Sequence, residues 1–307
     1  MSHGNLKPEL TLSKPFDLTT ISSPDGSISA KFVSFGATLT ELWVKDKKGK
    51  LRDVVLGYDD NSRLMTDTDH PVFNPIVGRY ANRLKNGTFS IPITKLPQPD
   101  GPNVYHIPTN DHDGTMLSVT LHGGLLGWDR RNWTLVAKTP TSVTYKHIDL
   151  AHEGFPGTVT AFATHTVTNG GVLNTVVRAT ATQKVSLSSI MNLDAFQDGS
   201  NDILSHHLQV DAGKVIDVDG NAIPTGKFIS VGGTPFDFRK EQKIGARWND
   251  TVNLCGQGTT LSSSYLKDLI SSLINLGCQG YDSAWIYDHP EDKKTGTSLW
   301  SDLSGIR

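Results

Sequence analysis

The chain has 307 residues, which is enough to bury a substantial core and allows one large domain or two small ones. Its formal net charge of −2 gives no electrostatic reason to expect binding to nucleic acid or an anionic membrane, and no apolar run is long enough for a signal peptide or a membrane span. Cys255 and Cys278 are the only cysteines and offer neither a disulfide framework nor zinc-site spacing, so we expect a reduced, cytoplasmic protein.

Apolar and polar side chains alternate in residues 27–36, 38–46 and 143–150, a period of two that is typical of half-buried strands. Residues 158–181 contain two β-rich runs separated by Asn-Gly-Gly at 169–171. Because Asn and Gly accept positive φ, this pattern predicts a hairpin. Many strands with few helical patterns between them predict an antiparallel all-β sandwich.

One later segment has helical spacing instead. Its apolar side chains fall at i, i+3, i+4, i+7 and i+8: Leu266, Leu269, Ile270, Leu273 and Ile274. This spacing is the signature of an amphipathic helix, with Ser264 able to cap its start and Gly277 able to end it. We therefore expect one inserted helix near 264–276.

Polar clusters are the candidates for chemistry, and each alone favours a structural role. His122 before two glycines reads as a turn histidine, Asp237 as a turn carboxylate paired with an arginine, and Asp282 as a turn acceptor. The sequence shows no phosphate loop, metal-ligand spacing or nucleophile elbow, so no metal is expected. It also shows no convincing carboxylate pair for glycoside hydrolysis.

Taken together and in chain order, five segments are far more specific than any one of them. They are SFGATLTELWVKDKKGKLRDVVLGYDD (34–60), GRYANR (78–83), LHGGLLGWDRRNW (121–133), VIDVDGNAIPTGKFISVGGTPFDFR (215–239) and GYDSAWIYD (280–288). In this order they resemble the aldose 1-epimerase family, the galactose mutarotases. The resemblance implies a single domain over 1–307 with a galactose mutarotase-like antiparallel β-sandwich, or supersandwich, and a sugar cleft on one face.

The same resemblance implies an isomerase of carbohydrate metabolism that interconverts the α and β anomers of hexoses such as galactose and glucose, without a cofactor. Asn82 and Arg83 would hold sugar hydroxyls, since an amide and a guanidinium fork suit such groups. His122 would contact the sugar near the anomeric carbon, and Asp282 would accept hydrogen bonds from hydroxyls. Arg79 is expected to be structural. The partner would be a monosaccharide, and the oligomeric state is left open.

Two tryptophans near these motifs have two readings. Trp128 and Trp285 could offer an apolar face to the sugar ring or could belong to the core.

The implied reaction needs an acid at the ring oxygen and a base at the anomeric hydroxyl, which the family supplies as His and Glu. The acid is expected within 185–197, but Ile190-Met191 stand there in a segment that is about two residues short and lacks histidine. The base is expected beyond Arg307, so the sandwich is expected to be C-terminally incomplete.

Several functions therefore stay open. The chain could be an active mutarotase. It could instead be a catalytically impaired sugar-binding or regulatory relative, including a truncated splice or gene-model variant. A carbohydrate-active enzyme of another reaction type is the third reading.

Overall fold

The computed structural model describes residues 14–68, 71–91, 103–113, 116–183, 202–219, 223–254, 281, 283–289 and 296–307. Across these residues the strand pairings are antiparallel, and the helices are short: α1 (Arg63–Thr66) and the 3₁₀ segments η1 (Trp128–Arg130) and η3 (Ile244–Leu254). The predicted antiparallel all-β class is confirmed. The helix predicted near 264–276 lies outside the described residues. None of the described helices is long and apolar enough to cross a membrane.

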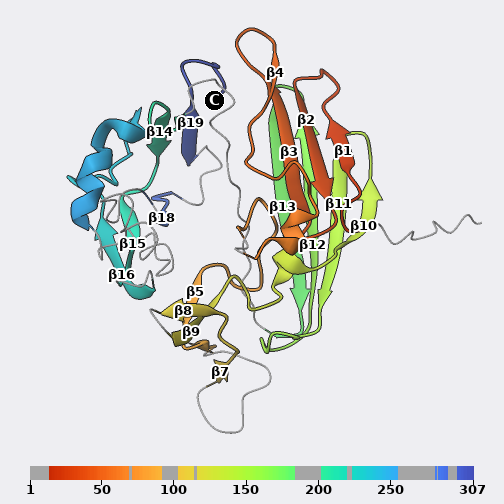
Figure 1. Cartoon of the computed structure of the whole chain (residues 1–307), viewed down its shortest axis with the longest axis vertical. Helices are drawn as coiled ribbons and strands as arrows, with labels where there is room; N and C mark the ends of the chain where they lie inside the picture. The colour runs from red at the N-terminus through yellow and green to blue at the C-terminus, as the bar shows by residue number, and fades with distance from the viewer. Residues whose placement is uncertain are drawn as a thin grey trace, which may run out of the picture.

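Two four-stranded sheets face each other on one side of the molecule (Figure 1). The first runs in the order β1 (Thr19–Ser22), β2 (Ile28–Val33), β3 (Thr38–Lys45) and β4 (Leu51–Asp53). The second runs in the order β10 (Thr134–Lys138), β11 (Ser142–Asp149), β12 (Val159–Thr168) and β13 (Val172–Ala181). Within each sheet, every strand pairs with its neighbour in the sequence.

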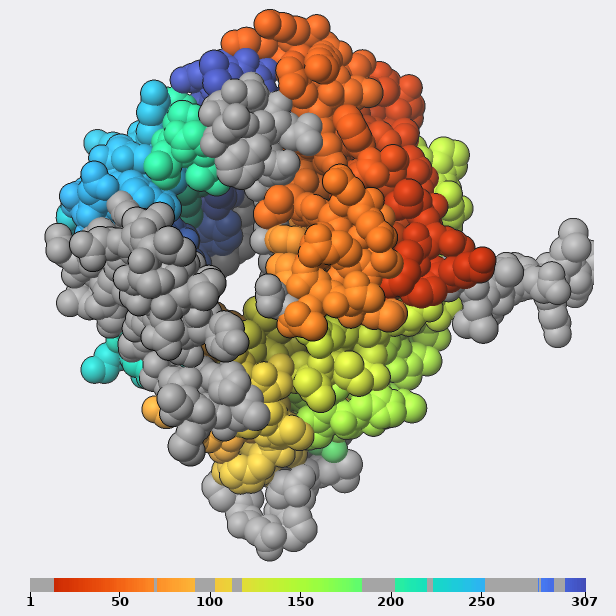
Figure 2. Space-filling view, in the orientation of Figure 1, coloured from red at the N-terminus to blue at the C-terminus, as the bar shows by residue number. Residues whose placement is uncertain are grey.

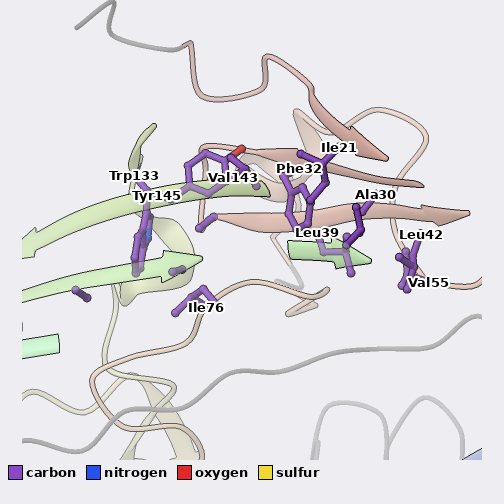
Figure 3. Packing of buried hydrophobic residues seen from close by; sticks show 14 of the residues in the cluster. Ile21, Ala30, Phe32, Leu39, Leu42, Val55, Ile76, Trp133, Val143 and Tyr145 are labelled. Atoms are coloured by element: carbon purple, nitrogen blue, oxygen red, sulfur yellow. The ribbon is translucent and has the colours of Figure 1, made fainter. Parts of the chain in front are cut away.

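One apolar cluster fills the space between these two sheets (Figure 3). Ile21 and Phe32 enter it from the first sheet, and Val143 and Tyr145 enter it from the second. All four side chains, with Trp133, are at most 1% exposed. Full burial of a large apolar side chain contributes about 1.5–3 kcal/mol, so this cluster is the main source of stability for the sandwich.

The predicted alternation is confirmed where it is clearest. The segments 27–36 and 38–46 contain β2 and β3, although β2 ends at Val33, and β11 covers all of 143–150 except its last residue. The Asn-Gly-Gly turn joins β12 to β13 with Thr168 opposite Val172, and Gly170 and Gly171 supply the positive φ values of 79° and 77°. These two residues lack a Cβ, which makes that conformation accessible at little cost.

Hydrogen bonds fasten this hairpin turn to the turn between β1 and β2. The Asp25 carboxylate accepts the backbone N–H of Gly170 (2.9 Å) and the hydroxyls of Ser23 (2.6 Å) and Ser27 (2.7 Å). In return, Asn169 Oδ1 accepts the Asp25 N–H (3.3 Å). The hydroxyl donors, followed by the backbone donors, hold the pKa of Asp25 well below its ordinary value.

A second group of strands lies on the other side of the molecule (Figure 1). These strands form two three-stranded sheets, in the orders β17-β14-β19 and β16-β15-β18. Their bounds are β14 (His207–Val210), β15 (Lys214–Val218), β16 (Pro224–Ser230), β17 (Gln242–Lys243), β18 (Trp285–Ile286) and β19 (Thr297–Trp300). Their apolar contacts centre on the buried Phe236 and Phe238, which pack against Tyr281 and Trp285.

Short strands connect the two sides at the lower edge of the view in Figure 1. They are β5 (Arg83–Lys85), β6 (Thr88–Ser90), β7 (Val104–His106), β8 (Asp111–Asp113) and β9 (Met116–Leu121), paired as β5-β9-β8 and β6-β7. A separate contact joins the sides where the backbone N–H of Lys47 donates to Ser304 O (2.8 Å). Figure 2 shows the surface hollowed between the blue and teal segments and the orange and olive segments.

Arg79 is the most deeply buried charged side chain among the described residues, at 2% exposure. Its Nε donates to Asp149 Oδ2 (2.8 Å), and its two terminal nitrogens donate to the carbonyls of Pro156 (2.7 Å) and Gly157 (2.6 Å). Burial alone would raise the pKa of Asp149, but hydrogen bonds from Arg79 and Trp128 lower it to about 2. The geometry fits the structural role predicted for Arg79.

Trp128 belongs to the same arrangement. Its Nε1 donates to Asp149 Oδ2 (2.8 Å), and its ring lies edge-on to Trp133 with centroids 5.7 Å apart. It is 2% exposed, and a Cβ at Gly78 would overlap its ring. Of the two roles left open for Trp128, this environment favours the core.

We expect Arg79→Met to lower the free energy of unfolding by about 3–5 kcal/mol, because it leaves the buried Asp149 carboxylate without its cation. Lys31→Met is the control, since the Lys31–Glu41 pair is exposed by 31% and 25% and such pairs contribute at most about 1 kcal/mol. Urea unfolding of both variants measures the difference. Equal losses for the two would show that Arg79 does not organise the fold.

A second prediction concerns His165 of β12, which is 4% exposed, stacks on Phe32 and pairs through Nδ1 with Thr175 Oγ1 (2.9 Å). Burial lowers its pKa from 6.5 to about 4. Between these values the unfolded chain binds a proton that the folded chain excludes, so the free energy of unfolding falls as the pH falls. The slope from one such group is at most about 1.4 kcal/mol per pH unit.

Urea unfolding between about pH 4 and about pH 7 should therefore be less pH-dependent for His165→Gln than for the wild type. His106→Gln, at an exposed histidine of β7, is the control and should keep the wild-type slope. A folded His165→Gln variant with an unchanged slope would contradict the assignment.

Candidate functional site

Asn82 and His122 are joined by two hydrogen bonds. The backbone N–H of Asn82 donates to His122 Nδ1 (3.2 Å), and the backbone N–H of His122 donates to the carbonyl of Asn82 (3.3 Å). Because Nδ1 accepts a hydrogen bond, the neutral ring carries its proton on Nε2. Two of the four predicted sugar-binding residues are therefore in direct contact.

Both residues have left-handed backbone conformations, with φ of 68° at Asn82 and 52° at His122. Such values are uncommon for residues other than glycine, and they persist where the surroundings hold them. Gly123 comes next, with φ of 88°, and a Cβ there would overlap the carbonyl of Gly78. The first glycine after His122 therefore permits the two motif segments to touch.

Arg83 lies beside this pair because β5 and β9 are adjacent and antiparallel. Its Cα partner in β9 is Leu121, the residue before His122. The Arg83 side chain is 17% exposed, and its Nε donates to Asp111 Oδ2 at 3.2 Å. Its two terminal nitrogens make no hydrogen bond with the residues that the structure describes. The guanidinium is thus oriented by one carboxylate and keeps its other donors.

Asn110 fixes the strand from the other side. Its side-chain amide donates to Leu121 O (3.1 Å), and its Oδ1 accepts the Leu121 N–H (2.7 Å). The adjacent Asn110 and Asp111 therefore hold the backbone before His122 and the side chain of Arg83. Neither residue lies in a recognisable motif, and their partners are 11 and 28 residues away, so no sequence pattern predicts their contacts.

The other predicted site positions have different outcomes. Asp282 and the segment with Ile190 and Met191 lie outside the described residues. Trp285, three residues after Asp282 in the sequence, is partly buried, and its Nε1 donates to Phe236 O (3.1 Å). This contact places much of its indole in the packing of the second group of strands.

Asp237 has the structural role predicted for it. Arg239 donates from Nε and Nη2 to its two carboxylate oxygens, each at 2.7 Å. Hydrogen bonds from Arg239 are the main reason that the pKa of Asp237 is lowered. Among the described residues, no group of His, Cys, Asp and Glu side chains is arranged to hold a metal ion.

The sequence and the fold of the chain are similar to those of known proteins. The family model "Aldose 1-epimerase" matches residues 17–271. A probable aldose 1-epimerase of Arthroderma benhamiae is 34% identical over 310 residues, covering 93% of this chain and 62% of the relative. The galactose mutarotase of Mus musculus is 33% identical over 224 residues, covering 73% of this chain and 61% of the relative. The alignments thus cover about three fifths of the length of these relatives.

Solved structures agree with the fold. The GalM/aldose epimerase homologue of C. elegans has a TM-score of 0.72 and 26% identity, covering 94% of this chain and 76% of that one. The galactose 1-epimerase of Lactobacillus acidophilus has a TM-score of 0.66 over 93% of this chain and 77% of that one, and at 19% identity it supports the fold alone. With its antiparallel sheets and the extent of the family match, the chain belongs to the aldose 1-epimerase family.

Proposed function

We propose that the chain recognises a hexose such as galactose or glucose through Asn82, Arg83 and His122. The observation that carries this proposal is the pair of hydrogen bonds between Asn82 and His122, next to the partly exposed guanidinium of Arg83. The names of the relatives, which include galactose mutarotases, support the same substrate class.

The chemistry of the three side chains suits a ring of hydroxyl groups. Sugar hydroxyls both donate and accept, so they match an assortment of fixed donors and acceptors. Asn82 is exposed, and its Oδ1 accepts only the Arg83 N–H (2.8 Å) among the described residues, so its amide nitrogen remains a donor. Arg83 adds two terminal nitrogens, and the ring of His122, when neutral, carries its proton on Nε2.

Rapid interconversion of anomers by this chain is the alternative. That reaction needs a proton donor at the ring oxygen and a proton acceptor at the anomeric hydroxyl. The segment 185–197, where the family resemblance puts the acid, contains no histidine. We therefore propose that the chain, as a single domain, recognises a hexose. We also propose that it interconverts the anomers more slowly than other members of the family.

Mutarotation of fresh α-D-galactose and α-D-glucose tests the reaction. We expect a rate at least about 100-fold below that of mouse galactose mutarotase under the same conditions, because one positioned proton-transfer group contributes typically 10²–10⁴-fold. Polarimetry with purified protein measures the rate. A rate comparable to that of the mouse enzyme would show that other side chains supply the acid and the base.

Titration calorimetry with galactose and glucose tests recognition. We expect Arg83→Ala to weaken binding about ten- to a hundredfold, because hydrogen bonds from a charged donor contribute roughly 1.5–3 kcal/mol. Arg178→Ala is the matched control, since Arg178 is an exposed arginine on β13.

Two results would overturn the recognition proposal. A cooperatively folded wild type without saturable binding at high millimolar sugar would exclude a hexose site. Saturable binding that Arg83→Ala leaves unchanged would put the site elsewhere on the molecule.

A further inference from the structure

We propose that Glu153 and Arg131 are positioning residues that hold His122 in the orientation needed for hexose recognition. This proposal rests on the function proposed above, because His122 is its object. Neither residue belongs to the predicted sugar-binding set. Both act through Leu126, four residues after His122 in the same loop.

The two side chains hold both backbone polar groups of Leu126. Glu153 Oε1 accepts the Leu126 N–H at 3.2 Å, and Arg131 Nε donates to Leu126 O at 2.8 Å. The two side chains also form an ion pair, with Arg131 Nη2 3.1 Å from Glu153 Oε1. Their side chains are 28% and 16% exposed, so the pair is only partly screened by water. Charge-assisted hydrogen bonds of this kind are stronger than neutral ones.

Close contacts carry this restraint back to His122. A Cβ at Gly124 would lie 2.5 Å from Glu153 Oε2, so the carboxylate rests directly against the second glycine after His122. A Cβ at Gly127 would overlap the carbonyl of His122, so the end of the loop packs directly against the backbone of His122 at its start. The loop from 122 to 127 is thus compact, and a shift of Leu126 displaces His122.

Both members of the pair are themselves anchored to the core. Glu153 lies in the loop between β11 and β12. This loop also supplies the carbonyls of Pro156 and Gly157 to the buried Arg79, which pairs with Asp149 at the end of β11. The carbonyl of Arg131 accepts the N–H of Gly36 (2.8 Å). A restraint on a loop is effective only when its own base is rigid, and these contacts provide that base.

His122 needs such a restraint because its backbone conformation is unfavourable in isolation. Its φ of 52° is in the left-handed region, which a free chain seldom populates at histidine. Without Glu153 and Arg131, the loop would relax toward other conformations. The hydrogen bond from Asn82 to His122 Nδ1 would then be lost for part of the time.

The test combines a spectrum of the histidine ring with sugar affinity. In ¹⁵N-histidine-labelled protein without sugar, with His122→Ala used for assignment, the ring nitrogens of His122 should show Nε2 protonated and Nδ1 accepting. In Glu153→Ala and Arg131→Ala this pattern should move toward an average of the two tautomers. Galactose affinity should fall in proportion to the fraction of molecules in which His122 keeps its place, by about tenfold if roughly one molecule in ten keeps it.

Further variants separate positioning from general stability. Glu153→Gln keeps an acceptor for the Leu126 N–H and should recover part of the affinity. The double variant should lose little more than either single variant, because the two side chains act as one unit. Glu41→Ala is the matched control: it removes an ion pair with Lys31 (2.8 Å) that is also partly exposed. Thermal unfolding of every variant checks that it is folded.

Each possible result either supports or overturns the positioning role. A folded Glu153→Ala variant with an unchanged His122 spectrum would overturn the positioning role. A changed spectrum with unchanged galactose affinity would also overturn it. If the wild type binds no hexose, the proposed function fails. In that event the His122 spectrum without sugar still decides whether the pair orients the ring.

Discussion

The ion pair between Arg79 and Asp149 is the constraint on which the candidate site depends. A buried guanidinium is unfavourable unless its donors are satisfied, and here they are met by one carboxylate and the carbonyls of one loop. This requirement fixes the loop between β11 and β12 against the segment that contains Arg79. Asn82 follows Arg79 by three residues, so the same interaction determines where the segment with the proposed sugar-binding residues leaves the core.

The candidate site is therefore held by hydrogen bonds to the sandwich core and is not a loop attached to an independent scaffold. The backbone of Gly36 donates to Arg131 O (2.8 Å) and accepts from Ile76 N–H (2.9 Å), which joins three segments distant in sequence. A Cβ at Gly36 would lie 2.6 Å from the carbonyl of Asp129, so only glycine fits. The connection between β2 and β3 thus contacts the 121–133 segment and the residues just before the 78–83 segment, before any ligand is considered.

The sequence predicted the strands of the sandwich well because each has one face in the core. The alternation in 143–150 and the hairpin across 169–171 are local patterns that depend on few distant contacts. The family resemblance, rather than periodicity, predicted Asn82, Arg83 and His122, and the structure brings these three residues from two segments together. Their roles in binding stay predictions, as does that of Asp282, which lies outside the described residues.

Asp111 and Glu153 could not be predicted in the same way. A carboxylate in a polar loop reads as a solvated surface group, and its partners Arg83 and Leu126 are 28 and 27 residues away. Only the path of the chain shows that these side chains meet the site. Segments that end a strand with several Asp, Glu, Gly and Pro residues, such as 149–157, are where such contacts should be sought in related chains.

The hydrogen bonds between the turns at 23–27 and 169–171 constrain how these two turns can change in evolution. Asp25 accepts from Gly170, and Asn169 accepts from Asp25, so each turn supplies groups that the other requires. An insertion in either turn would remove hydrogen bonds from both. These two turns are 144 residues apart in the chain. Their lengths and their polar residues should nevertheless change together among descendants of this sequence.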